Sequence, residues 1–205
     1  MLRSSFTFGD ESLPLLATAI HHGHELPSEL LAGCGISEAD RLREEDPQTG
    51  LIAALFPNHI IVHSSRFAID LNRSPDKAVY LKPEDCWGLP VRSVPVPEPL
   101  LESLRGDYTA WYGLLEYQLE RLLQKHPFLV VLDLHSFNHR RGGPQAPPDP
   151  QEQNPDIIIG RSNLQDKHYP AAQRLCDFMN GQDYLGRPLD CRQDVKFTGG
   201  NFPRW

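Results

Sequence analysis

The stretch Phe128-Leu-Val-Val-Leu-Asp-Leu-His-Ser136 decides how we expect this chain to fold. It begins as an uninterrupted apolar run that is too short for a helix, which predicts a central strand buried on both faces of a sheet. Asp133 and His135 stand at the carboxyl end of that strand, where ligands bind in open α/β sheets. His135 is therefore either a metal ligand or catalytic residue, or a buried histidine that is hydrogen-bonded to Asp133.

The rest of the chain alternates short apolar segments with helical patterns, which is typical of an α/β protein. The spacing of leucines and aromatic residues from 98 to 125 predicts one amphipathic helix, with Gly106 as the point where it could break. Further strands are predicted at 13–20, 58–63 and 156–160, and a further helix is predicted at about 169–180.

The composition is that of an ordinary globular protein: 205 residues, 40% hydrophobic and 23% charged, which suits a single domain over residues 1–205. A net charge of −7 without a lysine or arginine tract argues against nucleic-acid or membrane partners. The N-terminus lacks the apolar core of a signal peptide, and the four cysteines have no CxxC spacing. We therefore expect a cytoplasmic protein with reduced thiols. The sequence does not predict an oligomeric state.

Histidines cluster at the exit of the first predicted strand. His21, His22 and His24 lie within four residues, around Gly23, which we expect to let the backbone turn, and Glu25 follows. Histidine and carboxylate side chains this close can share one zinc ion. The alternative interpretation is a solvated polar turn.

Asp46 precedes Pro47 and an apolar pattern over residues 51–55. This order suits a helix N-cap followed by proline at the first helical position. The same helix would hold Asp46 rigidly if the residue were a metal ligand, and the sequence leaves both roles open.

Two arginines flank a strand-like apolar segment over residues 67–73, which ends in Asp-Leu-Asn-Arg. Arginine binds carboxylates through two parallel hydrogen bonds. Arg73, beside Asn72 at a predicted strand end, is therefore a candidate for anion recognition, and the alternative is that these arginines only contribute to the solubility of the surface. The following residues 74–97 are rich in proline and turn formers, and predict a long loop or an active-site cover.

Six motifs span nearly the whole chain in a fixed order. They are His21-His-Gly-His-Glu-Leu-Pro27, Glu45-Asp46, Ser65-Arg-Phe-Ala-Ile-Asp-Leu-Asn-Arg73, Asp133-Leu-His-Ser136, Pro155-Asp-Ile-Ile-Ile-Gly160 and Phe197-Thr-Gly-Gly200. In this order they resemble the N-formylglutamate amidohydrolases, relatives of the zinc carboxypeptidases and of aspartoacylase. The resemblance implies a three-layer α/β/α fold with a mixed, mostly parallel central sheet. It also implies a metal-dependent hydrolase that acts on an N-acylated amino acid.

The resemblance further implies a set of ligands for Zn²⁺ or another divalent metal. The family's His-x-Gly turn matches His21, its Glu-Asp pair places a carboxylate at Asp46, and its strand-end histidine is His135. The His-x-x-Glu spacing of the carboxypeptidases and aspartoacylase fits His22 and Glu25 instead. Glu25 therefore competes with Asp46, and His22 with His21, for a site with three protein ligands and an open water position.

The same resemblance implies a small anionic N-acyl amino acid as substrate. Bound zinc would lower the pKa of its water from roughly 15.7 to about 7, and the resulting hydroxide would attack the acyl carbonyl. Arg66 would stabilise the oxyanion, a contact worth on the order of 3 kcal/mol. Asn72 and Arg73 would hold the α-carboxylate of the substrate.

One expected residue has no match. In the relatives, a glutamate on a strand after the Gly-Gly motif acts as general base and acid. We therefore expect that the domain is truncated at its C-terminal end or that the protein lacks this step, with Glu25 as the one nearby substitute. Two alternative functions are a carboxypeptidase-like amide or peptide hydrolase and a non-catalytic module that binds a metal or an acyl-amino acid.

Overall fold

A four-stranded mixed sheet organises the first of two compact units, into which the chain divides after Phe137. The computed structural model describes residues 2–205. In the order of the sheet, the strands are β1 (Ser4–Phe8), β3 (Asn58–Val62), β2 (Leu15–Ala19) and β4 (Val130–Asp133). β1 is antiparallel to β3, whereas β3, β2 and β4 are parallel. The predicted α/β class with a mixed, mostly parallel sheet is confirmed.

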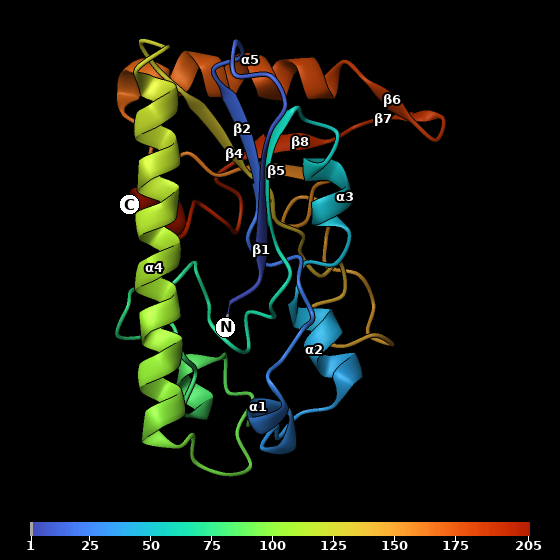
Figure 1. Ribbon diagram of the computed structural model, residues 1–205. Coiled ribbons are helices and arrows are strands. Elements are labelled where there is room, and N and C mark those ends of the chain that lie inside the picture. Colours follow the sequence, from blue (N-terminus) through green and yellow to red (C-terminus); the bar gives the residue numbers. More distant parts are fainter. Residues whose placement is uncertain (1) are drawn as a thin grey trace. The chain divides into compact units, whose positions relative to one another are not determined.

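Helices flank both sides of this sheet (Figure 1). The helices of the first unit are α1 (Ser28–Ala32), α2 (Glu38–Glu44), α3 (Thr49–Ala53), the 3-10 helix η1 (Pro83–Asp85) and α4 (Glu98–Leu123). Ala53 of α3 packs against Ala17 and Ala19 of β2. On the opposite face, Trp111 of α4 contacts Phe6 of β1, with the ring centroids 6.1 Å apart. The alternation of side chains along each strand thus supplies both helices with an apolar surface.

α4 confirms the predicted long amphipathic helix, with 26 residues. Its buried face is made by Leu101, Leu104, Tyr108, Trp111, Tyr112, Leu115 and Leu122, at the spacing of one helical stripe. Pro99 stands in the first turn, where the missing N–H costs nothing. Gly106 lies inside the helix without breaking it, because packing along the stripe outweighs the low helix propensity of one glycine.

β4 differs from the prediction in its place in the sheet. It is an edge strand that pairs only with β2 among the strands of this sheet, and Val130 and Val131 are 44% and 38% exposed. The prediction that it is central and buried on both faces is therefore wrong for this sheet. Its apolar character shows that it is a strand, but the order of strands depends on contacts far apart in the sequence.

The segment 67–73 is not a strand, although its apolar residues had made it look like one. Turns shape it instead: Ala68 N donates to Ser65 O at 2.9 Å, and Arg73 N donates to Asp70 O at 3.2 Å. Phe67, Ala68, Ile69 and Leu71 are all buried, which explains the apolar pattern without a sheet. The turns place Asp70 and its neighbours close to the end of β2.

The second unit contains two small sheets and one main helix. Its elements are β5 (Ile157–Ile159), η2 (Asp166–His168), α5 (Tyr169–Asn180), β6 (Asp183–Tyr184), β7 (Arg187–Pro188), β8 (Cys191–Gln193) and η3 (Phe202–Arg204). β5 pairs with β8 in parallel, and β6 pairs with β7 in a hairpin. The predicted strand at 156–160 and helix at 169–180 are confirmed.

The four cysteines of the chain carry free thiols, and three of them, Cys86, Cys176 and Cys191, are buried. In the part of the chain from residue 2 onward, no helix combines the length and the apolar character that crossing a membrane would require.

Candidate metal centre

Three potential metal ligands converge at the carboxyl ends of β2 and β4. One ligand atom each from His21, Asp46 and His135 lies within 4.8 Å of the others. His21 follows β2 by two residues, and His135 follows β4 by two residues. Because β2 and β4 are parallel neighbours, their ends meet at one edge of the sheet and bring the two imidazoles together.

His21 is oriented by a buried carboxylate. Its Nε2 lies 2.7 Å from Asp70 Oδ1, and both side chains are almost fully buried. Its Nδ1 is buried as well, has no hydrogen-bond partner among residues 2–205, and lies 3.5 Å from Asp46 Oδ2. A buried imidazole nitrogen without a partner is costly unless something else binds it. The arrangement leaves Nδ1 of His21 directed at the cluster.

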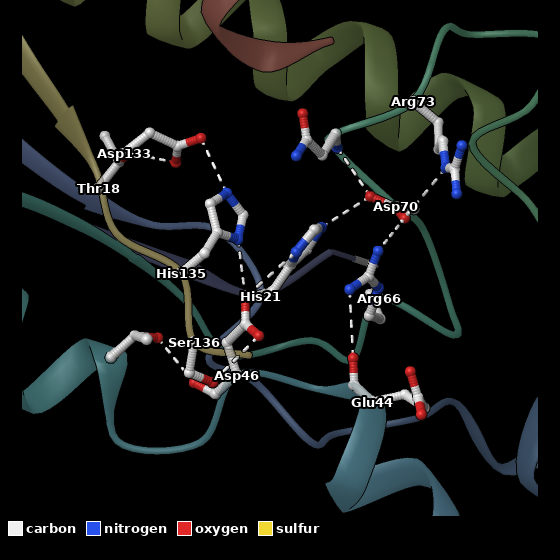
Figure 2. A network of polar contacts seen from close by, with 12 residues as sticks. Thr18, His21, Glu44, Asp46, Arg66, Asp70, Arg73, Asp133, His135 and Ser136 are labelled. Atoms are coloured by element: carbon white, nitrogen blue, oxygen red, sulfur yellow. Dashed lines mark hydrogen bonds and ion pairs between the residues drawn. The ribbon is translucent and has the colours of Figure 1, made fainter. Parts of the chain in front are cut away.

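His135 has the same kind of support. Its Nε2 lies 2.9 Å from Asp133 Oδ2, and Thr18 Oγ1 donates to Asp133 Oδ1 at 2.9 Å. Its Nδ1 lies 2.7 Å from Asp46 Oδ2. His135 is thus hydrogen-bonded to Asp133 and also faces the cluster (Figure 2), but it is not the buried histidine of the second interpretation, because 30% of its side chain is exposed.

The charge state of His135 follows from these two carboxylates. Burial lowers its pKa, but Asp133 and Asp46 outweigh burial and raise the pKa to about 10. Without a metal, the imidazole is therefore a cation that bridges two anions. A metal ion that binds Nδ1 has to displace its proton.

Asp46 is not the N-cap of α3, which was one of the two roles that the sequence left open. The helix begins at Thr49, and its N-cap is Gln48, which has a left-handed φ of 74°. Asp46 instead is held by its backbone, whose N–H donates to His21 O at 2.9 Å. The side chain is thereby free to turn toward His135, and Ser136 Oγ donates to its Oδ1 at 3.2 Å.

The carboxyl group of Asp46 is buried and ionised. Burial raises its pKa, but the hydrogen bond from His135 and the nearby imidazole of His21 hold the pKa well below its ordinary value. Two imidazole nitrogens and one carboxylate oxygen match the three protein ligands of a catalytic zinc site. The atoms that would hold the ion are Nδ1 of His21, Oδ2 of Asp46 and Nδ1 of His135.

The two competing ligands lie elsewhere. The ring of His22 packs on Gly50, where an added Cβ would come within 2.6 Å of the ring. The carboxylate of Glu25 accepts from Arg3 Nη1 at 2.7 Å, in an exposed ion pair. The structure therefore brings neither His22 nor Glu25 into the cluster.

Gly23 serves a close approach of two backbones and not the turn that we expected. A Cβ at Gly23 would lie 2.1 Å from the carbonyl carbon of His63, so no other residue fits without a backbone shift. Isolated bridges join Gly23 to Ser65 and Glu25 to Ser64 in parallel. They continue the pairing of β2 with β3 beyond the strand ends, which fixes the backbone on both sides of the cluster.

Asp70 connects His21 to the predicted anion-binding residues (Figure 2). Besides His21, its fully buried carboxylate accepts from Arg66 Nη2 at 2.8 Å and from the backbone N–H of Asn72 at 2.8 Å. Arg73 Nε lies 3.7 Å from the same carboxylate, and the hydroxyl of Tyr80 also donates to it. Burial raises the pKa of Asp70, but Arg66 and His21 outweigh burial and hold it well below its ordinary range.

Arg66 is held in place with one donor left over. Its Nη1 donates to Glu44 O at 3.2 Å, and its Nη2 is occupied by Asp70. Its Nε is buried and has no protein acceptor among residues 2–205. Burial lowers the pKa of Arg66, but the charge of Asp70 outweighs burial and raises it, so the side chain stays charged.

Sequence reasoning missed the central role of Asp70, although its signal lay inside the motif Asp-Leu-Asn-Arg. It also missed the network behind Asp46. Glu45, which is buried, accepts from Ser65 Oγ and lies 2.5 Å from His24 Nδ1. The two adjacent acidic residues thus have different partners: the carboxylate of Glu45 contacts the side chains of Ser65 and His24, and that of Asp46 faces the cluster.

Asp133→Asn is expected to weaken zinc affinity about 10- to 100-fold, the usual cost of losing a group that orients a metal ligand. Asparagine keeps the shape of the side chain but has no negative charge. It therefore orients His135 less strongly and makes its imidazole a weaker metal ligand. A competitive zinc titration against a chelator measures the change. The surface variant Asp10→Asn is the matched control, and equal affinity of the two variants would contradict the assignment.

The fold and the site define an α/β protein with a candidate metal centre beside two arginines that pair with Asp70. The chain matches the sequence model of the N-formylglutamate amidohydrolase family over residues 13–204. It belongs to this family of amidohydrolases, as the ordered motifs indicated.

Two solved structures share the fold. One is N-formylglutamate amidohydrolase from Ralstonia eutropha JMP134, with 15% identity and a TM-score of 0.66, over 97% of this chain and 78% of that chain. The other is a gene product of Agrobacterium tumefaciens, with 16% identity and a TM-score of 0.62, over 95% and 73% of the respective chains. The comparison with curated protein sequences found no match.

Proposed function

We propose that this protein is a metal-dependent amidohydrolase that cleaves the amide bond of N-formylglutamate or of a related N-acyl amino acid. The observation that carries the proposal is the convergence of His21, Asp46 and His135 one hydrogen bond away from the arginines around Asp70. Family membership supports the type of reaction. A zinc ion or another divalent metal, when bound, would supply a Lewis acid and an activated water.

The chain's own residues prepare this site for hydrolysis. The pairs of Asp70 with His21 and of Asp133 with His135 fix the tautomer and the plane of each imidazole, so that both Nδ1 atoms face Asp46. Hydrogen bonds of this kind also make the histidines stronger ligands. Both histidines follow paired parallel strands, so the hydrogen bonds of the sheet hold the backbone that carries them.

Arg66 is proposed to stabilise the oxyanion that forms when the acyl carbonyl is attacked. Its buried Nε–H is the donor without a protein partner, and Glu44 and Asp70 hold the guanidinium in place. A donor that is already oriented needs no reorganisation as the charge develops, and one such contact contributes about 3 kcal/mol to transition-state binding.

Arg73 and Asn72 are proposed to hold the α-carboxylate of the substrate. The side chain of Arg73 is 37% exposed, so an incoming anion can reach it. Two arginines share the single negative charge of Asp70, which leaves local positive charge in a protein of net charge −7. An anionic substrate is attracted by such a local excess of positive charge.

We also propose a cytoplasmic location, because the four cysteines are free thiols, as is usual in a reducing compartment.

Formate release from N-formyl-L-glutamate tests the proposal. Zinc-loaded protein should produce formate and glutamate in equal amounts, stop when a chelator removes the metal, and recover when zinc is added back. Amino-acid release from peptides without formate release would indicate a carboxypeptidase-like enzyme instead. Binding of metal and substrate without any product would indicate a non-catalytic module.

Arg73→Ala should raise the KM for N-formylglutamate by about 10- to 100-fold, because a charge-assisted hydrogen bond to the substrate contributes about 1.5–3 kcal/mol. The free energy of unfolding should change by less than about 1 kcal/mol, since Arg73 is a partly exposed partner of Asp70. Arg105→Ala, on the exposed face of α4, is the matched control. An unstable Arg73→Ala protein with a normal KM would make the residue structural.

A further inference from the structure

Trp87 lies over both arginines of the proposed substrate site. The guanidinium carbon of Arg66 is 4.8 Å from the centroid of the indole, and that of Arg73 is 5.8 Å away. The face of an aromatic ring carries partial negative charge and attracts a cation within about 6 Å of the centroid. The two arginines that share Asp70 therefore also share one aromatic neighbour.

The loop that carries Trp87 is firmly anchored. Its neighbour Cys86 is fully buried in a cluster with Phe67, Tyr80 and Val91. Short backbone hydrogen bonds close the loop, from Cys86 N to Pro83 O at 3.0 Å, from Gly88 N to Pro83 O at 2.8 Å and from Leu89 N to Cys86 O at 2.8 Å. The indole also meets Tyr80 edge-on, at 6.3 Å between ring centroids. Its position over the arginines is thus set by the fold.

Neither burial nor backbone preference explains a tryptophan at this position. The residue is 47% exposed, so much of its apolar surface still faces solvent. Its φ of 51° lies in the left-handed region, which bulky residues rarely adopt. Strained positions of this kind persist where the surrounding structure enforces them, and they are concentrated at functional sites. The contact with the two guanidinium groups is what distinguishes the residue.

The geometry limits how an anion can approach. Both guanidinium carbons lie over the indole ring, while Asp70 contacts Nη2 of Arg66 and Nε of Arg73. A carboxylate binds a guanidinium edge-on, through coplanar N–H donors, and this direction stays compatible with an aromatic ring on the face. An adjacent apolar ring also excludes water, which strengthens the attraction between the charges.

We propose that Trp87 is a positioning residue of the substrate site, which holds Arg66 and Arg73 in the planes that receive a carboxylate and shields that carboxylate from water. The inference rests on the proposed function in taking the carboxylate to be that of an N-acyl amino acid. A tryptophan that only covered the loop would affect folding and leave anion binding unchanged.

Binding of glutarate, a dicarboxylate without an amide bond, tests the inference on zinc-loaded protein. Isothermal titration should show that Trp87→Leu, which keeps apolar volume but has no aromatic face, weakens glutarate binding about tenfold. Trp87→Phe keeps an aromatic face and should stay within about threefold of the wild type.

Tryptophan emission gives a second readout that does not depend on the leucine variant folding. Glutarate should change the emission of the wild-type protein and of Trp205→Phe, the matched control, but not that of Trp87→Phe. Unchanged wild-type emission, or equal glutarate affinity of the wild type and a folded Trp87→Leu protein, overturns the inference.

Formate release by the same preparations separates the two proposals. Glutarate binding that depends on Trp87, without formate release from N-formylglutamate, leaves this inference standing while the proposed reaction fails. Formate release with a KM that Trp87→Leu does not alter supports the reaction and overturns the role of Trp87.

Discussion

His135→Ala is expected to remove stoichiometric zinc and to abolish metal-dependent hydrolysis. The side chain supplies one of three ligand atoms within 4.8 Å of one another, and alanine leaves only His21 and Asp46. Losing a ligand should cost more than the about 10- to 100-fold in affinity that removal of a supporting hydrogen bond costs. Elemental analysis of the purified protein after dialysis against zinc measures the metal content.

His126→Ala is the matched control for this experiment, because His126 bonds to the backbone of Glu11 and lies outside the cluster. It should keep one zinc per chain. Full zinc content and full activity of the His135→Ala protein would show that His135 is not a metal ligand. Loss of the fold is monitored separately by circular dichroism, since His135 is only 30% exposed.

Asp70→Asn is expected to damage the fold and the site together. The variant leaves Arg66 buried without its counter-charge, and breaking a buried ion pair from one side costs about 3–5 kcal/mol. It also removes the carboxylate that orients His21, so zinc affinity should fall as well. Urea unfolding of the metal-free protein and a zinc titration measure the two effects.

The stability difference between the wild type and Asp70→Asn should depend on pH in one direction. The pKa of Asp70 is lowered well below its ordinary value of 3.8, against the effect of burial, by Arg66 and His21. The stability that ionised Asp70 contributes to the folded protein is therefore complete above the ordinary pKa of 3.8. It is lost as the pH falls through the lowered pKa of the folded state. A difference that grew on acidification would contradict the role of Asp70 as a buried anion.

Glu25→Gln is the matched control for Asp70→Asn. Glu25 forms an exposed ion pair with Arg3, so its loss should change the free energy of unfolding by less than about 1 kcal/mol. Zinc content should stay at the wild-type level. Loss of zinc from the Glu25→Gln protein would instead identify Glu25 as a metal ligand, as the His-x-x-Glu spacing had suggested.

Secondary structure with a strong local signal could be predicted from the sequence. The leucine and aromatic stripe of α4 and the apolar run of β4 gave the correct element type, because the period of the pattern is a local property. The edge position of β4 and the turns over residues 67–73 could not be predicted. Both depend on which distant segments supply the neighbouring backbone and the covering side chains.

The membership of the site was easier to predict than its internal connections. His21, Asp46 and His135 stood in ordered motifs, and the structure brings them together. The nitrogen of His21 that faces the cluster is determined by Asp70, which lies 49 residues away along the chain, and that of His135 is determined by Asp133. The contact of Trp87 with the arginines had no sequence signal, since cation–π pairs have no fixed spacing.

Anomalous diffraction from crystals grown with zinc can show directly whether His21, Asp46 and His135 bind the metal. We expect one strong peak per chain, at about 2.0–2.2 Å from Nδ1 of His21, Oδ2 of Asp46 and Nδ1 of His135. Nε2 of each histidine should remain on its carboxylate. A zinc ion bound through His22 and Glu25, or no peak at the end of β2 and β4, would show that these three residues do not form a metal centre.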